Sequence, residues 1–305
     1  MSLTSDPELP SDPADSDGIP CVLVFNANDP SGAAGLAADI GAIASVGAHA
    51  LPILTGAYTR DTAEILDHYR LDEDAVSEQA RTILEDVTAQ VIKVGFVGSA
   101  ETLSVISAIA ADYADVPLIA YMPDLSWWDE VQIDLYLDAF RDLLLPQTTV
   151  LVGNHSTLCR WLLPEWSSSK NPGPREIARA ANALGVPYTL VTGISLPDQS
   201  IENVLATPQT VLYTGRFERF DAVFSGAGDT LSAALAALLA TGSDLSEAVE
   251  EALGYLDKCL NAGFRPGMGH LLPDRLFWAQ PDTDEDAADD SAGSPFDFPA
   301  HDTKH

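Results

Sequence analysis

Short apolar runs alternate with helical patterns through most of this sequence. Runs such as "CVLVF" (21–25) and "VIKVGFV" (91–97) are short and continuous, which is typical of strands buried on both faces. In the segment 33–47, apolar residues recur at helical spacing and a glycine ends the pattern. The other predicted strands are 50–55, 116–121, 149–153 and 188–193, with a strand meander over 201–220. The other predicted helices are 73–89, 100–112, 131–145, a helix that follows the strand 149–153 and ends near residue 163, 174–184, 228–242 and 244–262.

This alternation predicts an α/β fold with three α/β/α layers. A mostly parallel central sheet with helices on both faces buries strands of this kind. Such sheets bind ligands beyond the carboxyl ends of their strands, and several predicted strands here run into glycine-containing turns. We expect a single domain over 20–280. The ends, 1–19 and 281–305, are rich in Asp, Ser and Pro and are predicted to be disordered.

Composition and charge narrow the classes of function. The 305 residues leave room for a sizeable core, and 46 acidic against 15 basic residues give a net charge of −31. A field of that sign repels nucleic acid and anionic membrane surfaces. The sequence contains no apolar run long enough to span a bilayer, and its first residues lack the basic and apolar regions of a secretory signal. We therefore expect a cytoplasmic protein that binds neither nucleic acid nor membrane.

The cysteines and histidines do not predict a metal site. The three cysteines are far apart in the sequence, and the six histidines show no ligand spacing. We expect no metal site built from these side chains.

The stretch "FSGAGDTLSAA" (224–234) carries the first candidate chemistry. Gly226 and Gly228, with Ala227 between them, let the backbone curl so that successive N–H groups converge, and the following helix directs its positive dipole end to the same point. This pattern predicts an anion hole. Asp229 beside it is suited to take a proton from a hydroxyl that attacks a phosphoryl group held there. The alternative is that Asp229 or Thr230 is an ordinary helix N-cap.

A second motif, "NANDPSGAAGLAADIGA" (26–42), places a polar loop between a strand and a helix. Asp29 and loop glycines such as Gly32 are candidates for binding a small polar substrate. An ordinary turn in which Pro30 fixes the backbone is the alternative.

In order along the chain, "NDPSGAAGLAADI", "KVGFVGS" (93–99), "LLLPQTTVLVGN" (143–154) and "GAGDTLSAALAALLA" resemble the hydroxymethylpyrimidine/phosphomethylpyrimidine kinase family of thiamine biosynthesis. That family has the ribokinase-like fold. The resemblance covers residues 20–278, including "AGFRPGMGHLLPDRLFW" (262–278).

The resemblance implies an activity, two cofactors and an assembly. It implies that MgATP phosphorylates the hydroxymethyl group of a pyrimidine and then its monophosphate, and that the protein is a homodimer. By position, the implied roles are the substrate loop for Asp29 and Gly32, the pyrimidine wall for Phe96, the anion hole for Gly226, Ala227 and Gly228, the general base for Asp229, and the neighbourhood of ATP for Asn154, Thr192 and Gly193.

The sequence also departs from the family pattern at four positions. Asp229 stands where the family commonly has cysteine, although aspartate is usual in the wider superfamily. Tyr121 replaces an aspartate near the metal, and Asp124 could substitute for it only with a shift of register. Thr157 replaces a glutamate that helps to organise Mg²⁺. Arg60 replaces a neutral amide at the pyrimidine, where it could bind a phosphorylated substrate or simply pair with Asp61 or Asp29.

Three hypotheses of function follow from these residues. The first is a pyrimidine kinase with Asp229 as base, and the second is a kinase of another small alcohol, such as a pyridoxal-like heterocycle or a sugar. The third is a pyrimidine-binding or regulatory protein in which catalysis has weakened, as Tyr121 and Thr157 suggest. A Tyr121 ring that fills the phosphate site would favour the third hypothesis.

Overall fold

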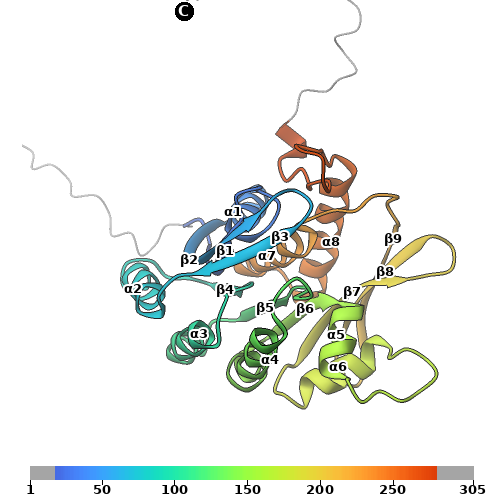
Figure 1. Ribbon diagram of the computed structural model, residues 1–305, viewed down its shortest axis with the longest axis horizontal. Coiled ribbons are helices and arrows are strands. Elements are labelled where there is room, and N and C mark those ends of the chain that lie inside the picture. Colours follow the sequence, from blue (N-terminus) through green and yellow to red (C-terminus); the bar gives the residue numbers. More distant parts are fainter. Residues whose placement is uncertain (1–17, 280–305) are drawn as a thin grey trace, which may run out of the picture.

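The strands between residues 18 and 279, the part of the chain that the computed structural model describes, form one sheet (Figure 1). Its strand order is β3-β2-β1-β4-β5-β6-β7-β8-β9. The predicted disordered ends fall outside the described residues, apart from residues 18 and 19. The strands are β1 Cys21–Asn28, β2 His49–Arg60, β3 Ile65–Arg70, β4 Val91–Val94, β5 Leu118–Met122, β6 Val150–Asn154, β7 Tyr188–Ser195, β8 Ser200–Ala206 and β9 Val211–Glu218.

Six neighbouring strands, from β2 through β1 and β4 to β7, run parallel. Antiparallel strands extend the sheet at both edges, β3 on one side and β8 with β9 on the other. The parallel strands are short and almost continuously apolar because helices cover both of their faces. The predicted α/β fold is confirmed.

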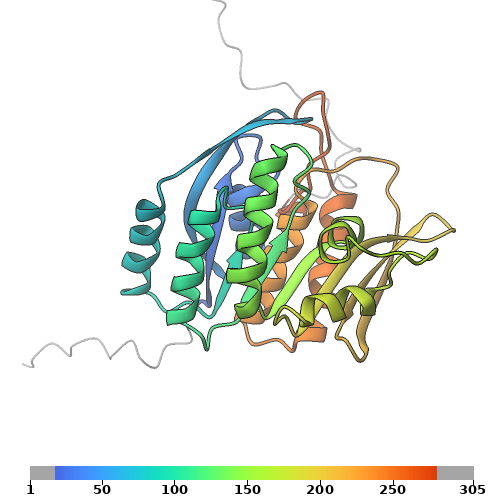
Figure 2. The same cartoon turned by 60° about the horizontal axis from the view of Figure 1, so that its bottom comes forward.

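Eight α-helices in the described residues form the outer layers. Helices α1, α7 and α8 cover one face of the sheet and α2 to α6 the other, and Figure 2 shows α2, α3 and α4 standing side by side. Each face has its own apolar core. The buried run 229–238 makes α7 apolar on nearly every side, as expected of a helix inside the fold. The helices are α1 Gly35–Ser45, α2 Glu73–Leu84, α3 Ala100–Asp112, α4 Glu130–Ala139, α5 His155–Leu162, α6 Pro174–Asn182, α7 Ala227–Ala240 and α8 Leu245–Asn261.

Several elements differ from the prediction. Strand β3 was not expected, and β2 extends to residue 60 to pair with it. The strand predicted over 91–97 ends at Val94, and the chain leaves the sheet before Gly98, which has φ +83°. A π-helical turn, Phe140–Leu144, and a 3₁₀ turn, Leu145–Gln147, continue α4.

The segment after α8 packs against the loop after β2 and against α1, and it finishes in a 3₁₀ turn, Phe277–Ala279. None of the helices in the described residues is long and apolar enough to cross a membrane.

Candidate active site

The first turn of α7 lies against the loop that follows β1. Gly226 is the N-cap of α7 with φ +85°, a conformation that favours glycine. A side chain there would collide with the carbonyl oxygen of Ala33, and one at Gly228 would collide with the Tyr121 hydroxyl. The sequence therefore needs both glycines for close packing at the point where the predicted anion hole begins.

The Asp229 carboxylate, on the first turn of α7, is enclosed by hydrogen-bond donors. Its Oδ1 accepts from Lys93 Nζ at 2.9 Å and from Asn26 Nδ2 at 2.9 Å, and its Oδ2 accepts from the Gly35 N–H at 3.3 Å. Lys93 Nζ also donates to Asp39 Oδ1 at 2.8 Å, and Asn26 Nδ2 to Asp39 Oδ2 at 2.8 Å. One buried ammonium thus serves two carboxylates, and we call Asn26, Asp39, Lys93 and Asp229 the Lys93 cluster.

Burial and the shared ammonium set the ionisation of this cluster. Burial by itself raises the pKa of Asp229, but the charge and hydrogen bond of Lys93, with those from Asn26 and the Gly35 amide, hold that pKa below its usual range. Burial raises the pKa of Asp39 to about 6 despite the same lysine. Burial lowers the pKa of Lys93, but the two carboxylates outweigh this and raise it. Asp229 is therefore an ionised carboxylate of low basicity at neutral pH.

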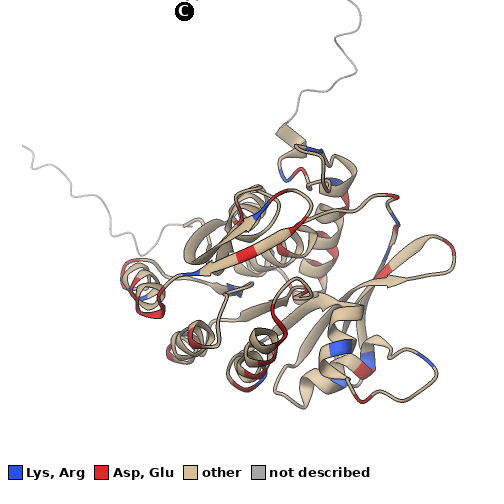
Figure 3. Ribbon diagram, in the orientation of Figure 1, with Lys and Arg blue, Asp and Glu red and all other residues tan. Residues whose placement is uncertain are grey.

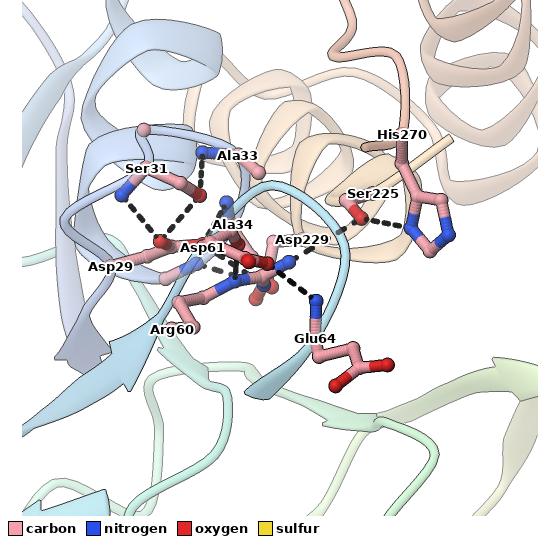
Figure 4. A network of polar contacts seen from close by, with 12 residues as sticks. Asp29, Ser31, Ala33, Ala34, Arg60, Asp61, Glu64, Ser225, Asp229 and His270 are labelled. Atoms are coloured by element: carbon pink, nitrogen blue, oxygen red, sulfur yellow. Dashed lines mark hydrogen bonds and ion pairs between the residues drawn. The ribbon is translucent and has the colours of Figure 1, made fainter. Parts of the chain in front are cut away.

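Asp29 organises the loop after β1. Its Oδ1 accepts from the Ser31 amide at 2.8 Å and the Ser31 Oγ at 2.7 Å, and its Oδ2 accepts from the Ala34 amide at 2.9 Å (Figure 4). The Arg60 Nη1 donates to the same Oδ2 at 3.2 Å. Gly32, with φ +72°, has open space around it. Asp29 therefore holds both the loop and the Arg60 guanidinium in place.

Arg60 comes from the end of β2 and spans the site. Besides the pair with Asp29, its Nε donates to the Asp61 carbonyl at 3.0 Å and its Nη2 to the Ser225 Oγ at 3.5 Å. Ser225 Oγ lies 3.0 Å from His270 Nδ1 (Figure 4). Arg60, Ser225 and His270, together with Gly226, line a cavity of about 490 Å³. Asp29 and Asp61 were the two side chains expected to pair with Arg60, and the ion pair with Asp29 is present.

Phe96 lies at the centre of an aromatic cluster and is only 2% exposed. Its ring stacks on Tyr58 with centroids 5.6 Å apart, and His68, Trp127 and Trp128 meet it edge-on. Trp127 also lines the cavity beside Arg60, so the aromatic cluster adjoins the site. Phe96 is therefore surrounded by side chains of this protein, and its contact with a pyrimidine stays a prediction.

The residues expected near ATP lie together at the carboxyl ends of β6 and β7. Asn154 pairs in register with Thr192, and a side chain on Gly193 would collide with the Asn154 amide. Asn154 also caps α5, its Oδ1 accepting from the Ser156 amide at 3.0 Å. The Gly193 amide donates to Asn203 Oδ1 at 2.9 Å.

The other two positions that depart from the family pattern, Tyr121 and Thr157, lie in different parts of the structure. Tyr121 points across the end of β5 to Gly228, and burial raises the pKa of Tyr121 well above its usual range, so it stays a neutral hydroxyl. Asp124 is 58% exposed at its side chain and lies 3.7 Å from Arg160. Asp124 lines the site cavity and, with Thr157, a second cavity of about 290 Å³ between α4 and α5.

In the described part of the chain, no group of three or more His, Cys, Asp or Glu side chains is arranged to hold a metal ion. Mg²⁺ commonly retains waters and binds through substrate phosphates together with one or two carboxylates. The exposed carboxylate of Asp124 is compatible with that mode of binding.

The sequence did not lead us to three charged residues that organise the site: Lys93, Asp39 and Arg275. Lys93 and Asp39 interrupt the apolar runs "VIKVGFV" and "GLAADIGAIA", which is a readable signal, because an isolated charge in a buried element needs a partner. Arg275 carried no such signal. Its Nε donates to Thr230 Oγ1 at 3.0 Å, its Nη1 to the Gly32 carbonyl at 3.1 Å and its Nη2 to the Ala33 carbonyl, so it ties the β1 loop to α7.

Comparison with solved structures shows that this chain has the ribokinase-like α/β fold. Bacillus subtilis pyridoxal kinase, in an ADP complex, matches with a TM-score of 0.77 and 21% identity over 87% of this chain and 100% of that chain. A phosphomethylpyrimidine kinase from Clostridium difficile matches with a TM-score of 0.65 and 19% identity, over 80% and 100% of the two chains. At these identities the likeness concerns the fold alone.

The family model described as phosphomethylpyrimidine kinase matches residues 29–274. The chain belongs to this family of phosphotransferases. The hydroxymethylpyrimidine/phosphomethylpyrimidine kinase of Streptomyces coelicolor is 28% identical over 85% of this chain and 95% of its own. The resemblance seen in the sequence motifs is confirmed.

Proposed function

We propose that this protein uses ATP to phosphorylate hydroxymethylpyrimidine, its monophosphate, or both, in thiamine biosynthesis. The observation that carries the proposal is that Asp229, the Gly226–Gly228 turn and the Asp29 loop lie together beyond the carboxyl end of the central strand β1, in a chain of this family. In this arrangement the substrate lies in the cavity beside Arg60, close to the first turn of α7.

Each part of the site has a chemical task in this proposal. The amides of Gly226, Ala227 and Gly228 stabilise the negative charge on the transferring phosphoryl group. Asp229 accepts the proton of the attacking hydroxyl when the substrate is the alcohol. Asn154, Thr192 and Gly193 hold the nucleotide, which supplies the phosphoryl group, and bound Mg²⁺ offsets the charge of its phosphates.

A second candidate function is pyrimidine binding with weakened catalysis. Two observations favour it: the Tyr121 hydroxyl packs against Gly228 at the predicted anion hole, and the Asp229 oxygens already accept three hydrogen bonds. Pyridoxal kinases share the fold, so pyridoxal is a further alcohol to test. We also expect a cytoplasmic homodimer, as the family resemblance implies, and sedimentation analysis would test the dimer.

Mass spectrometry of products from MgATP with the alcohol, the monophosphate and pyridoxal tests these candidates. We expect phosphorylated pyrimidine, and we expect Asp229→Asn to lower kcat for the alcohol by at least about 100-fold while retaining pyrimidine binding. Asp244→Asn is the matched control, because Asp244 caps the neighbouring helix α8. Pyrimidine binding without any product would instead support the second candidate.

A further inference from the structure

The guanidinium of Arg60 is a buried cation that faces the site cavity. Its side chain is only 6% exposed, yet it lines the cavity of about 490 Å³. Its hydrogen bonds within the described residues use three of its five N–H donors: one each to Asp29, Asp61 and Ser225. Two donors are left for a ligand, and guanidinium groups pair well with phosphate oxygens.

The Arg60 guanidinium lies next to the first turn of α7, whose amide dipoles attract an anion. Ser225, which Arg60 contacts, directly precedes Gly226, and His270 reaches the same hydroxyl. Two acidic side chains, Glu64 and Asp124, also line the cavity. Figure 4 shows the Glu64 carboxylate pointing away from Arg60, and the Asp124 side chain is largely exposed to solvent.

The state of Asp229 bears on which nucleophile the site can use. An alcohol must lose a proton as it attacks, so it needs an effective base. Both Asp229 oxygens are engaged by Lys93, Asn26 and the Gly35 amide, which leaves a weak base. A phosphate monoester has a second pKa near 6, so it is mostly a dianion at neutral pH and attacks without giving up a proton.

We propose that the site selects a substrate that already carries a phosphate, the monophosphate of the hydroxymethyl heterocycle, and that Arg60 is the residue that determines this specificity. The inference rests on the proposed kinase function and sharpens it. A phosphate oxygen of the substrate forms a bond to the γ-phosphorus of ATP, and the bond from that phosphorus to the β–γ bridging oxygen breaks. ADP leaves with the electron pair, and no proton has to be moved.

Calorimetric titration without nucleotide tests the selectivity independently of turnover. We expect the wild-type protein to bind the monophosphate at least about 10-fold more tightly than the alcohol, because a hydrogen-bonded charge pair with phosphate adds about 10- to 100-fold in affinity. Arg60→Gln should lose this preference, because it weakens binding of the monophosphate by at least about 10-fold more than binding of the alcohol. Arg60→Lys should retain part of it. Arg70→Gln is the matched control, since Arg70 lies on β3 of the same hairpin with its side chain 56% exposed.

The outcomes separate this inference from the proposed function. Equal affinity of the wild-type protein for the two ligands would overturn the inference, and this result needs no variant to fold. An unchanged preference in Arg60→Gln would remove Arg60 from the role. A parallel assay with MgATP completes the test: binding preference without product would leave the selectivity standing and refute the kinase function. Product from both substrates with equal kcat/KM would do the reverse.

Discussion

His68 is an ionisable residue held inside the aromatic cluster. It belongs to β3, and its ring contacts those of Tyr58 and Phe96 edge-on with centroids 5.5 and 5.0 Å away. Within the described residues its Nε2 has no hydrogen-bond partner. Burial lowers the pKa of His68 to about 4, although nearby Asp67 opposes the shift. The folded protein therefore holds this imidazole neutral.

We expect His68 to make the protein less stable as the pH falls from about 6.5 to 4. In this window the imidazole takes up a proton in the unfolded chain but not in the folded one, so the free energy of unfolding decreases with falling pH. The shift from 6.5 to about 4 corresponds to a loss of at most about 3 kcal/mol. Urea denaturation at several pH values would measure it.

His68→Gln should lose that part of the pH dependence, whereas His49→Gln, at an exposed position on β2, should keep it. Other groups titrate in the same window, among them Asp39, so the comparison concerns the difference between variants. Parallel pH profiles for wild type and His68→Gln would show that His68 is protonated in the folded state.

The site residues show how far single positions can be read from a sequence. Asp229, Gly226 and Gly228 could be placed because the turn and the helix after it have a local pattern. The contact from Lys93 to Asp229 joins β4 to α7, which are 136 residues apart, so no local pattern contains it. The signal that was available, an isolated lysine in a buried strand, shows that Lys93 needs a partner but does not identify it.

The segment after α8 (262–279), which we call the clasp, joins two elements of the site by hydrogen bonds. Through Arg275 it joins the β1 loop, at the carbonyl groups of Gly32 and Ala33, to Thr230 on α7. Tyr255 on α8 donates to the Arg275 carbonyl at 2.9 Å and so fixes the clasp itself. The separation between the β1 loop and α7 therefore depends on a side chain that lies 243 residues from Gly32 in the sequence.

Arg275→Ala should destabilise the protein by about 3 kcal/mol and raise KM for the pyrimidine. Three hydrogen bonds from a charged donor are lost, and buried carbonyl groups are left without partners. Denaturant unfolding measures the first effect and steady-state kinetics the second. Arg179→Ala, at an exposed position on α6, is the control and should remain near wild type. A change of less than about 0.5 kcal/mol in Arg275→Ala would show that the clasp carries no stability.

At the level of elements, the sequence predicted the central strands, the β8–β9 meander at one edge of the sheet and most helices, but not the edge strand β3. Strand β3, "ILDHYR", has polar and exposed residues on both sides, so it lacks the alternation that marks a half-buried strand. It exists because it pairs with the extended end of β2. The π-helical turn at Phe140–Leu144 lies within the helix predicted over 131–145, but its π geometry was not predicted.

The charge of the whole molecule exceeds anything that ion pairing can neutralise. With 15 basic and 46 acidic residues, the chain keeps a net charge of −31 however its ion pairs are arranged. Figure 3 shows acidic residues distributed over α2, α3, α4 and α8, on both faces of the sheet. Repulsion among like charges destabilises a compact state, and dissolved salt screens it.

The folded state should therefore become more stable as ionic strength rises from about 10 mM to about 300 mM. Over that range the Debye length falls from about 30 Å to below 10 Å, so repulsion between distant carboxylates is largely removed. We expect the midpoint of thermal unfolding to rise by several degrees, with equal slopes in NaCl and KCl because the effect depends on charge screening. Sodium sulfate at the same ionic strength is the control for surface exclusion, which would raise the midpoint further only at higher concentration. A midpoint that stays level or falls in both chloride salts would mean that surface repulsion does not limit the stability of this protein. In that case the acidic residues would matter for solubility alone.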